Sequence, residues 1–164
     1  MRIERFETWW VQRGENFFDE KHRGRSNMDW DVVVIKLTAD NGAEGIATAM
    51  AARSARVTES YLEDNIAPVV LGRSAYEREA IWQDLWNIDR NLTFFPVYLP
   101  GPVDVALWDM AAKEAGLPLY KYLGAYRNQL PVYASGLFHD RPEEYVEEAL
   151  RYREQGIRCY KAHP

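Results

Sequence analysis

The chain of 164 residues is 47% apolar and 13% aromatic, enough to bury one sizeable core with at most a small second unit. Its formal net charge of −5 argues against nucleic-acid binding, for which a basic stripe is expected. No apolar run reaches the roughly 20 residues of a membrane span, and the first residues do not form a signal peptide, so we expect a cytoplasmic protein without a membrane partner.

Three strands are predicted at the start of the chain. Residues 2–11 are rich in apolar and aromatic side chains, and residues 31–39 contain the β-branched run Val32-Val33-Val34-Ile35. The turn signal Asp40-Asn41-Gly42 then leads into a third extended run, residues 43–50. These segments predict a small antiparallel meander.

Helical periodicity follows. Apolar residues repeat at helical spacing in 54–68, and Ser74 with Glu77 matches a capping box in front of a second helix. Residues 102–116 begin with proline and end with glycine, as a helix commonly does, and residues 119–123 predict a short further helix.

The pattern changes again after Gly124. Residues 130–135 predict a strand, 142–155 a helix and 157–163 a second strand, which together make one βαβ unit. A parallel pair with one helix leaves both strand edges unpaired, so we expect it to need a larger sheet or barrel. Either the natural product continues beyond Pro164 or another chain completes it.

Two strings closely resemble the mandelate racemase and muconate lactonizing branch of the enolase superfamily. They are residues 101–113 (GPVDVALWDMAAK) and 116–124 (GLPLYKYLG), while 156–164 (GIRCYKAHP) resembles the family's second barrel strand. The resemblance implies an α+β capping domain, residues 1–125, built from a three-stranded antiparallel meander plus helices. Residues 126–164 would be the start of an α/β (β/α)₈ barrel, truncated after strand two.

The resemblance also implies a reaction, removal of the proton α to a carboxylate. A Mg²⁺ ion stabilises the charge that develops, while a lysine or histidine takes the proton. Barrel chemistry lies at the carboxyl ends of strands, so Lys161 and His163 are the candidate catalytic residues. Many relatives have Lys-x-Lys here, with the first lysine on the substrate carboxylate and the second as base.

This sequence departs from that pattern, because it reads Lys161-Ala162-His163. Lys161 could bind the carboxylate while His163 moves the proton, since histidine exchanges protons near neutral pH. The alternative is that neither is catalytic, because a lysine and a histidine at a strand end are more often simply solvated.

The metal site is expected elsewhere. Relatives take three carboxylate ligands from barrel strands three, four and five, all beyond Pro164 of this chain, so no metal ligand is assigned. Mg²⁺ is expected in the full-length enzyme and not on this chain alone.

Two loops are candidates for substrate binding, because in relatives they close over the substrate. They correspond to residues 14–29 and 48–53. Cations there would suit an anionic, hydroxylated substrate such as an acid sugar, although a solvated loop is the ordinary alternative. The candidate substrate-binding residues are Phe17, Lys21, His22, Arg23, Arg25 and Arg53.

Other conspicuous residues are expected to be structural. Asp104 and Asp109 should cap or pair within the fold, and the lone Cys159, which excludes an internal disulfide, should be buried. Core packing is expected for the aromatic residues Trp82, Trp86, Phe94, Phe95, Tyr98 and Trp108.

Two functions remain open at this point. The first is the N-terminal part of a Mg²⁺-dependent enzyme acting on a small carboxylate, with acid-sugar dehydratase preferred over racemase or cycloisomerase and with this isolated chain inactive. The second is a non-catalytic truncated or split product that serves as an interaction or oligomerisation module. In either case we expect a homo-oligomer or association with the missing barrel portion.

Overall fold

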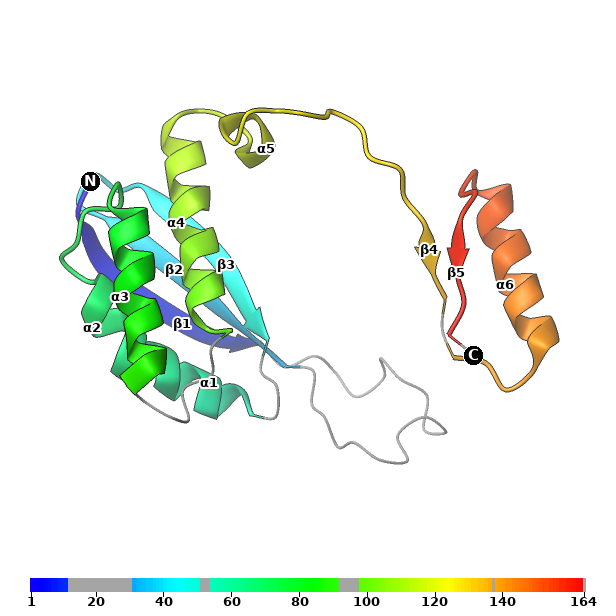
Figure 1. The fold of residues 1–164 in the computed structure, drawn as a ribbon, viewed down its shortest axis with the longest axis horizontal. Helices are drawn as coiled ribbons and strands as arrows, with labels where there is room; N and C mark the ends of the chain where they lie inside the picture. The colour runs from blue at the N-terminus through cyan, green and yellow to red at the C-terminus, as the bar shows by residue number, and fades with distance from the viewer. Residues whose placement is uncertain (12–30, 51–53, 92–97, 137, 164) are drawn as a thin grey trace. The chain divides into compact units, whose positions relative to one another are not determined.

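The computed structural model describes residues 1–11, 31–50, 54–91, 98–136 and 138–163. The chain forms two compact units, Met1–Gly124 and Ala125–Pro164, and each is described by itself (Figure 1). Within the described ranges, no helix combines the length and the apolar character needed to cross a membrane.

The first unit contains a three-stranded antiparallel sheet in the order β1 (Ile3–Val11), β2 (Val32–Ala39) and β3 (Glu44–Met50). In the central strand, Val33 and Ile35 are fully buried and alternate with half-buried neighbours. This alternation arises because successive side chains of a strand point to opposite faces. The predicted meander is confirmed.

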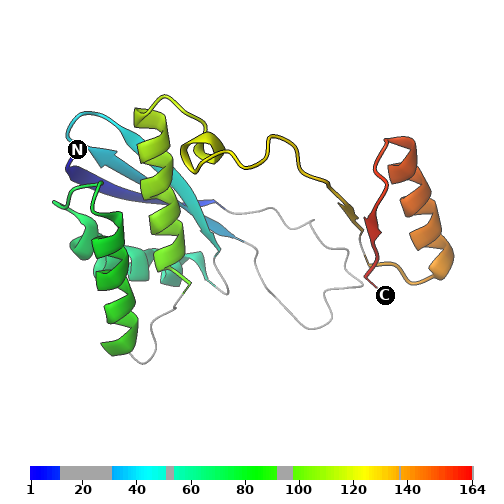
Figure 2. The same cartoon turned by 45° about the horizontal axis from the view of Figure 1, so that its top comes forward.

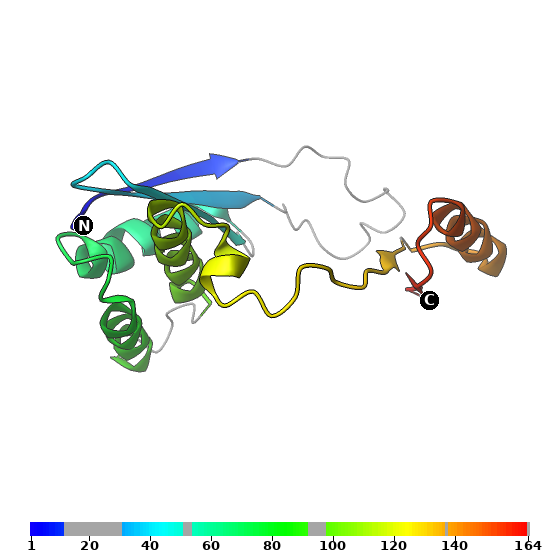
Figure 3. The ribbon, with the colours of Figure 1, turned by 90° about the horizontal axis from the view of Figure 1, so that it is seen from above.

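The helices of the first unit gather on one face of this sheet (Figures 2 and 3). Leu85 and Met110, each at most 1% exposed, belong to the core that these helices form with the strands. In chain order the helical elements are α1 (Ala55–Tyr61), the π turn η2 (Leu62–Ile66), α2 (Ala67–Val70), α3 (Arg78–Asn91), α4 (Pro100–Glu114) and α5 (Leu119–Tyr122).

The beginning of α3 differs from the predicted capping box. Ser74 Oγ accepts a hydrogen bond from the N–H of Tyr76 at 3.3 Å, and the Glu77 carboxylate lies 3.4 Å from Arg73 Nε. Ser74 also forms an isolated bridge with Arg2, which commits its backbone to an extended pairing before the helix begins. The capping-box prediction was therefore wrong, because a tertiary pairing holds the serine outside the helix.

The backbones of β3 and α4 approach each other at Gly45. A Cβ atom at this position would lie 2.0 Å from the carbonyl oxygen of Ala106 and 2.8 Å from Met110 Cβ. Only glycine allows a strand to lie this close to a helix. The contact fixes where α4 crosses the sheet.

Asp109 ties the same two elements together. Its Oδ2 accepts the N–H of Ile46 in β3 at 2.8 Å and lies 2.6 Å from Lys113 Nζ, one turn further along α4. Asp109 therefore pairs within the fold, as expected.

Burial raises the pKa of the other aspartate, Asp104, above its ordinary value, and the charge of Glu79 adds to the rise.

The expected core role of the aromatic residues was wrong for two of them. Trp86 is 42% exposed and Tyr98 is 48% exposed. Trp82 is half-buried and stacks on Trp86 with ring centroids 6.4 Å apart, so the pair lies along the outer part of α3 while aliphatic side chains fill the core. Trp108 is half-buried and packs edge-on against Tyr122. Phe94 and Phe95 lie outside the described residues.

The second unit is a βαβ arrangement of β4 (Ala134–Ser135), α6 (Pro142–Glu154) and β5 (Tyr160–Lys161), with parallel strands. The strands predicted over residues 130–135 and 157–163 were too long, since only two residues of each are paired. Hydrogen bonding to a strand on each side stabilises a longer strand, and in the described part of this unit each strand has a single partner.

Limited proteolysis should distinguish the two units. Among the described residues of the second unit, Ala134 is the one buried apolar side chain, whereas Val132, Val146 and Leu150 are 50% or more exposed. Little apolar burial means a low free energy of local opening, so we expect cleavage within residues 125–164 well before the helices and strands of the first unit are cut. Mass spectrometry of a digestion time course measures this. Equal protection of both units in a monomer would contradict it.

Candidate functional site

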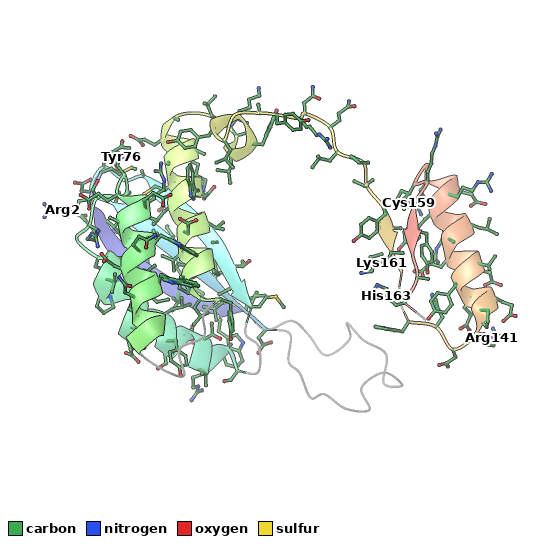
Figure 4. The ribbon with its side chains drawn as sticks, in the orientation of Figure 1. Arg2, Tyr76, Arg141, Cys159, Lys161 and His163 are labelled. Carbon is green, nitrogen blue, oxygen red and sulfur yellow. The ribbon has the colours of Figure 1, made fainter. Side chains whose placement is uncertain are left out.

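The carboxyl ends of β4 and β5 bring three polar side chains together. Ser135 pairs in register with Lys161, and Ser135 Oγ lies 3.2 Å from His163 Nε2. Figure 4 shows Cys159, Lys161 and His163 following one another along the segment that contains β5. The carboxyl ends of parallel strands are where barrel enzymes carry their chemistry.

The side on which these groups lie is set by Tyr160. Its hydroxyl donates to Glu148 of α6 at 2.6 Å, so Tyr160 points toward the helix. Neighbouring side chains of a strand alternate in direction, which places Lys161 on the side away from α6, where it is exposed. The same alternation explains why Cys159 is exposed and why the expectation of a buried cysteine was wrong.

His163 is held by three contacts and is half-buried. Besides Ser135, the ring of Phe138 lies 5.3 Å from its imidazole ring, centroid to centroid. The hydroxyl of Tyr145, on α6, lies 2.5 Å from the His163 carbonyl oxygen. Side chain and backbone of His163 are thus both in contact with the rest of the unit.

Sequence reasoning missed Ser135 and Tyr145. Ser135 could have been found, because it ends the strand predicted to lie beside the one that carries Lys161 and His163. No sequence signal could have found Tyr145, because the contact of its hydroxyl with a strand end depends on tertiary structure.

A buried carboxylate lies behind the strand ends. Glu148 is 4% exposed, and its Oε2 accepts the Tyr160 hydroxyl at 2.6 Å and lies 2.8 Å from His139 Nε2. Arg151 adds a positive charge 3.8 Å from Oε1. Burial, together with the hydrogen bond and charge of Glu148, raises the pKa of Tyr160 to about 12, so this tyrosine stays a hydrogen-bond donor at physiological pH.

Gly136 lies directly against Tyr160. A Cβ atom there would come 2.1 Å from the Tyr160 hydroxyl oxygen, and the Gly136 N–H donates to the Lys161 carbonyl at 3.0 Å. The position just beyond β4 therefore has no room for a side chain while Tyr160 keeps its bond to Glu148.

The residues described do not fit a magnesium site. No group of three or more His, Cys, Asp or Glu side chains is placed to hold a metal in the described part of the chain. Mg²⁺ takes oxygen ligands, whereas the side chains at the end of β5 offer nitrogen. The candidate substrate-binding residues all lie outside the described residues; they are Phe17, Lys21, His22, Arg23, Arg25 and Arg53.

Comparison with known proteins places this fold. Residues 24–124 match the model of the mandelate racemase / muconate lactonizing enzyme N-terminal domain. A D-mannonate dehydratase of Rhizorhabdus wittichii is 37% identical over 137 residues, which cover 82% of this chain and 34% of that protein. The chain spans about a third of the length of the curated relatives it matches.

Solved structures agree with this family match. The L-talarate/galactarate dehydratase from Salmonella typhimurium superposes with a TM-score of 0.76 at 27% identity, covering 99% of this chain and 44% of that one. A racemase from Streptomyces coelicolor A3(2), solved with bound magnesium, shares the fold with a TM-score of 0.76 at 24% identity, over 96% of this chain and 45% of that one. The chain belongs to the mandelate racemase / muconate lactonizing enzyme family of the enolase superfamily.

Proposed function

We propose that this chain is the N-terminal part of an enzyme that removes the proton α to a carboxylate, and that an acid-sugar dehydratase is preferred over a racemase or cycloisomerase. The observation that carries the proposal is the meeting of Lys161, His163 and Ser135 at the carboxyl ends of two parallel strands. The preference for dehydration is supported by relatives named D-mannonate dehydratase and L-talarate/galactarate dehydratase.

In this proposal the exposed ammonium of Lys161 binds the substrate carboxylate and orients the α-carbon toward β5. His163 then accepts or returns a proton at an imidazole nitrogen, a role suited to a side chain that exchanges protons near neutral pH. Ser135, 3.2 Å from Nε2, limits the directions in which the imidazole can point. The chemistry is assigned to this side of the strands because Tyr160 on the other side is committed to Glu148.

Mg²⁺ is proposed for the complete enzyme on the strength of family membership, and its ligands would come from outside the described residues. When bound, it would supply positive charge for the carbanion-like state of the substrate. The two loops named from the sequence are proposed to contact an anionic sugar acid. A cytoplasmic location stays a prediction, as does a homo-oligomer or association with the missing barrel portion.

Proton exchange tests the proposed function. A protein that joins this chain to a complete barrel should, with Mg²⁺ in deuterated buffer, exchange the α-proton of at least one member of an acid-sugar panel, as seen by proton NMR. Removal of Mg²⁺ by a chelator should stop the exchange. A folded full-length protein that exchanges no α-proton and forms no dehydrated product across the panel would refute the proposal.

The alternative, a non-catalytic interaction module, has one observation in its favour. The buried apolar residues of the described chain, apart from Ala134, all belong to the first unit, which therefore has a core of its own. A stable first unit that self-associates without any exchange activity in the full-length protein would favour this alternative.

A further inference from the structure

Tyr145 joins the two strand ends through its hydroxyl. The oxygen accepts the backbone N–H of His139, in the segment after β4, at 3.0 Å. It also lies 2.5 Å from the carbonyl oxygen of His163, after β5, and 3.2 Å from the carbonyl oxygen of His139. A phenol has one proton to donate, and the shorter contact directs it to His163.

The ring of Tyr145 is itself held in place by a pair formed by the half-buried His139 and the buried Glu148. His139 packs edge-on against it with ring centroids 4.8 Å apart, and His139 Nε2 lies 2.8 Å from Glu148 Oε2. Glu148 follows Tyr145 by three residues on α6, so both lie on the same face of the helix. A chain of contacts thus runs from the buried carboxylate through His139 and Tyr145 to the backbone of His163.

We propose that Tyr145 is a positioning residue for His163, and this rests on the proposed function in that His163 is taken to move the proton. The Tyr145 hydroxyl fixes the His163 carbonyl, while Ser135 contacts Nε2, so the backbone and the ring of His163 are both held and the imidazole keeps one orientation. A general acid or base works only when its nitrogen is placed within a fraction of an ångström of the proton it moves. Without the Tyr145 hydroxyl, the His163 carbonyl loses this contact and the backbone of His163 is free to move.

NMR of the imidazole nitrogens tests the positioning without any activity measurement. The rings of His139 and His163 can be assigned from single His→Gln variants of the full-length protein. We expect Nε2 of His163 to show the chemical shift of a persistent hydrogen bond with Ser135, and the Tyr145→Phe variant to average both ring nitrogens toward the values of a solvated imidazole. His139 should keep its tautomer in that variant, because its bond to Glu148 remains.

Tyr152→Phe is the matched control. Tyr152 lies two turns along the same helix, and its ring contacts Tyr160 at 6.2 Å. Loss of this hydroxyl should leave the nitrogens of His163 unchanged. Unaltered nitrogen signals of His163 in Tyr145→Phe would overturn the proposal. Simultaneous collapse of the His139 and His163 signals would also overturn it, because Tyr145 would then support the whole unit rather than His163.

Kinetics of the full-length protein separates this proposal from the one on which it rests. Tyr145→Phe should lower kcat on the order of tenfold or more while KM changes little, the signature of a misplaced catalytic group. Full activity in His163→Asn, with the His163 ring averaged in Tyr145→Phe, would support the positioning and refute the proposed role of His163. An inactive His163→Asn with a fully active Tyr145→Phe would leave the proposed function standing and overturn this inference.

Discussion

Replacement of His163 by asparagine in the full-length protein is expected to lower the rate of α-proton exchange by about three orders of magnitude, within the range that general acid-base catalysis contributes. Asparagine removes Nε2 and with it the 3.2 Å contact to Ser135 Oγ, while its amide keeps a polar group near the position of Nδ1. It cannot accept and return a proton near neutral pH. The loss should therefore appear in kcat, while the free energy of unfolding and the overall structure stay unchanged.

Lys161→Met should behave differently, because it removes a binding charge while keeping most of the side-chain volume. The expected result is a higher KM for carboxylate substrates, accompanied by some loss of kcat if the substrate is misaligned. Lys121→Met, which removes an exposed lysine from α5 in the first unit, is the matched control.

For His163, wild-type exchange rates in His163→Asn would show that the proton is moved by another group.

Gly45→Ala is expected to destabilise the first unit by about 3 kcal/mol or more, at the upper end of what overpacking costs. The added Cβ would lie 2.0 Å from the Ala106 carbonyl oxygen, and because that atom is backbone, it cannot rotate away. Either α4 moves off the sheet or β3 shifts, and both open the core around Met110. Urea denaturation followed by circular dichroism measures the change.

Gly101→Ala provides the control for this substitution. A Cβ at Gly101, in the first turn of α4, meets nothing within 4 Å, so the free energy of unfolding should change little. If Gly45→Ala unfolds at the same urea concentration as Gly101→Ala, the close approach of β3 and α4 does not limit the stability of the first unit.

The elements that could be predicted are those specified by local sequence. The β-branched run at 32–35 and the turn at 40–42 predicted β2 and its pairing with β3, and the periodicity of residues 142–155 predicted α6. The family resemblance based on residues 101–124 is confirmed by the match of residues 24–124, as is the α+β class of the capping domain.

The features that could not be predicted depend on contacts between distant segments. The capping box at Ser74 was wrong because Arg2 pairs with that residue, and the strands of the second unit were too long because each has one described partner. The sequence identified Lys161 and His163 as candidates for a strand end. It could not show that Ser135 and Tyr145 contact His163, since these contacts span 28 and 18 residues.

The close approach of Gly136 to Tyr160 also limits how this sequence can evolve. A side chain at position 136 would collide with the phenol oxygen, and loss of that phenol would leave the buried Glu148 with one donor fewer. A mutation at either position alone is therefore penalised, by collision in one case and by the loss of a hydrogen bond to a buried carboxylate in the other. Positions 136 and 160 should therefore change together among members of the family, and position 148 should change with them.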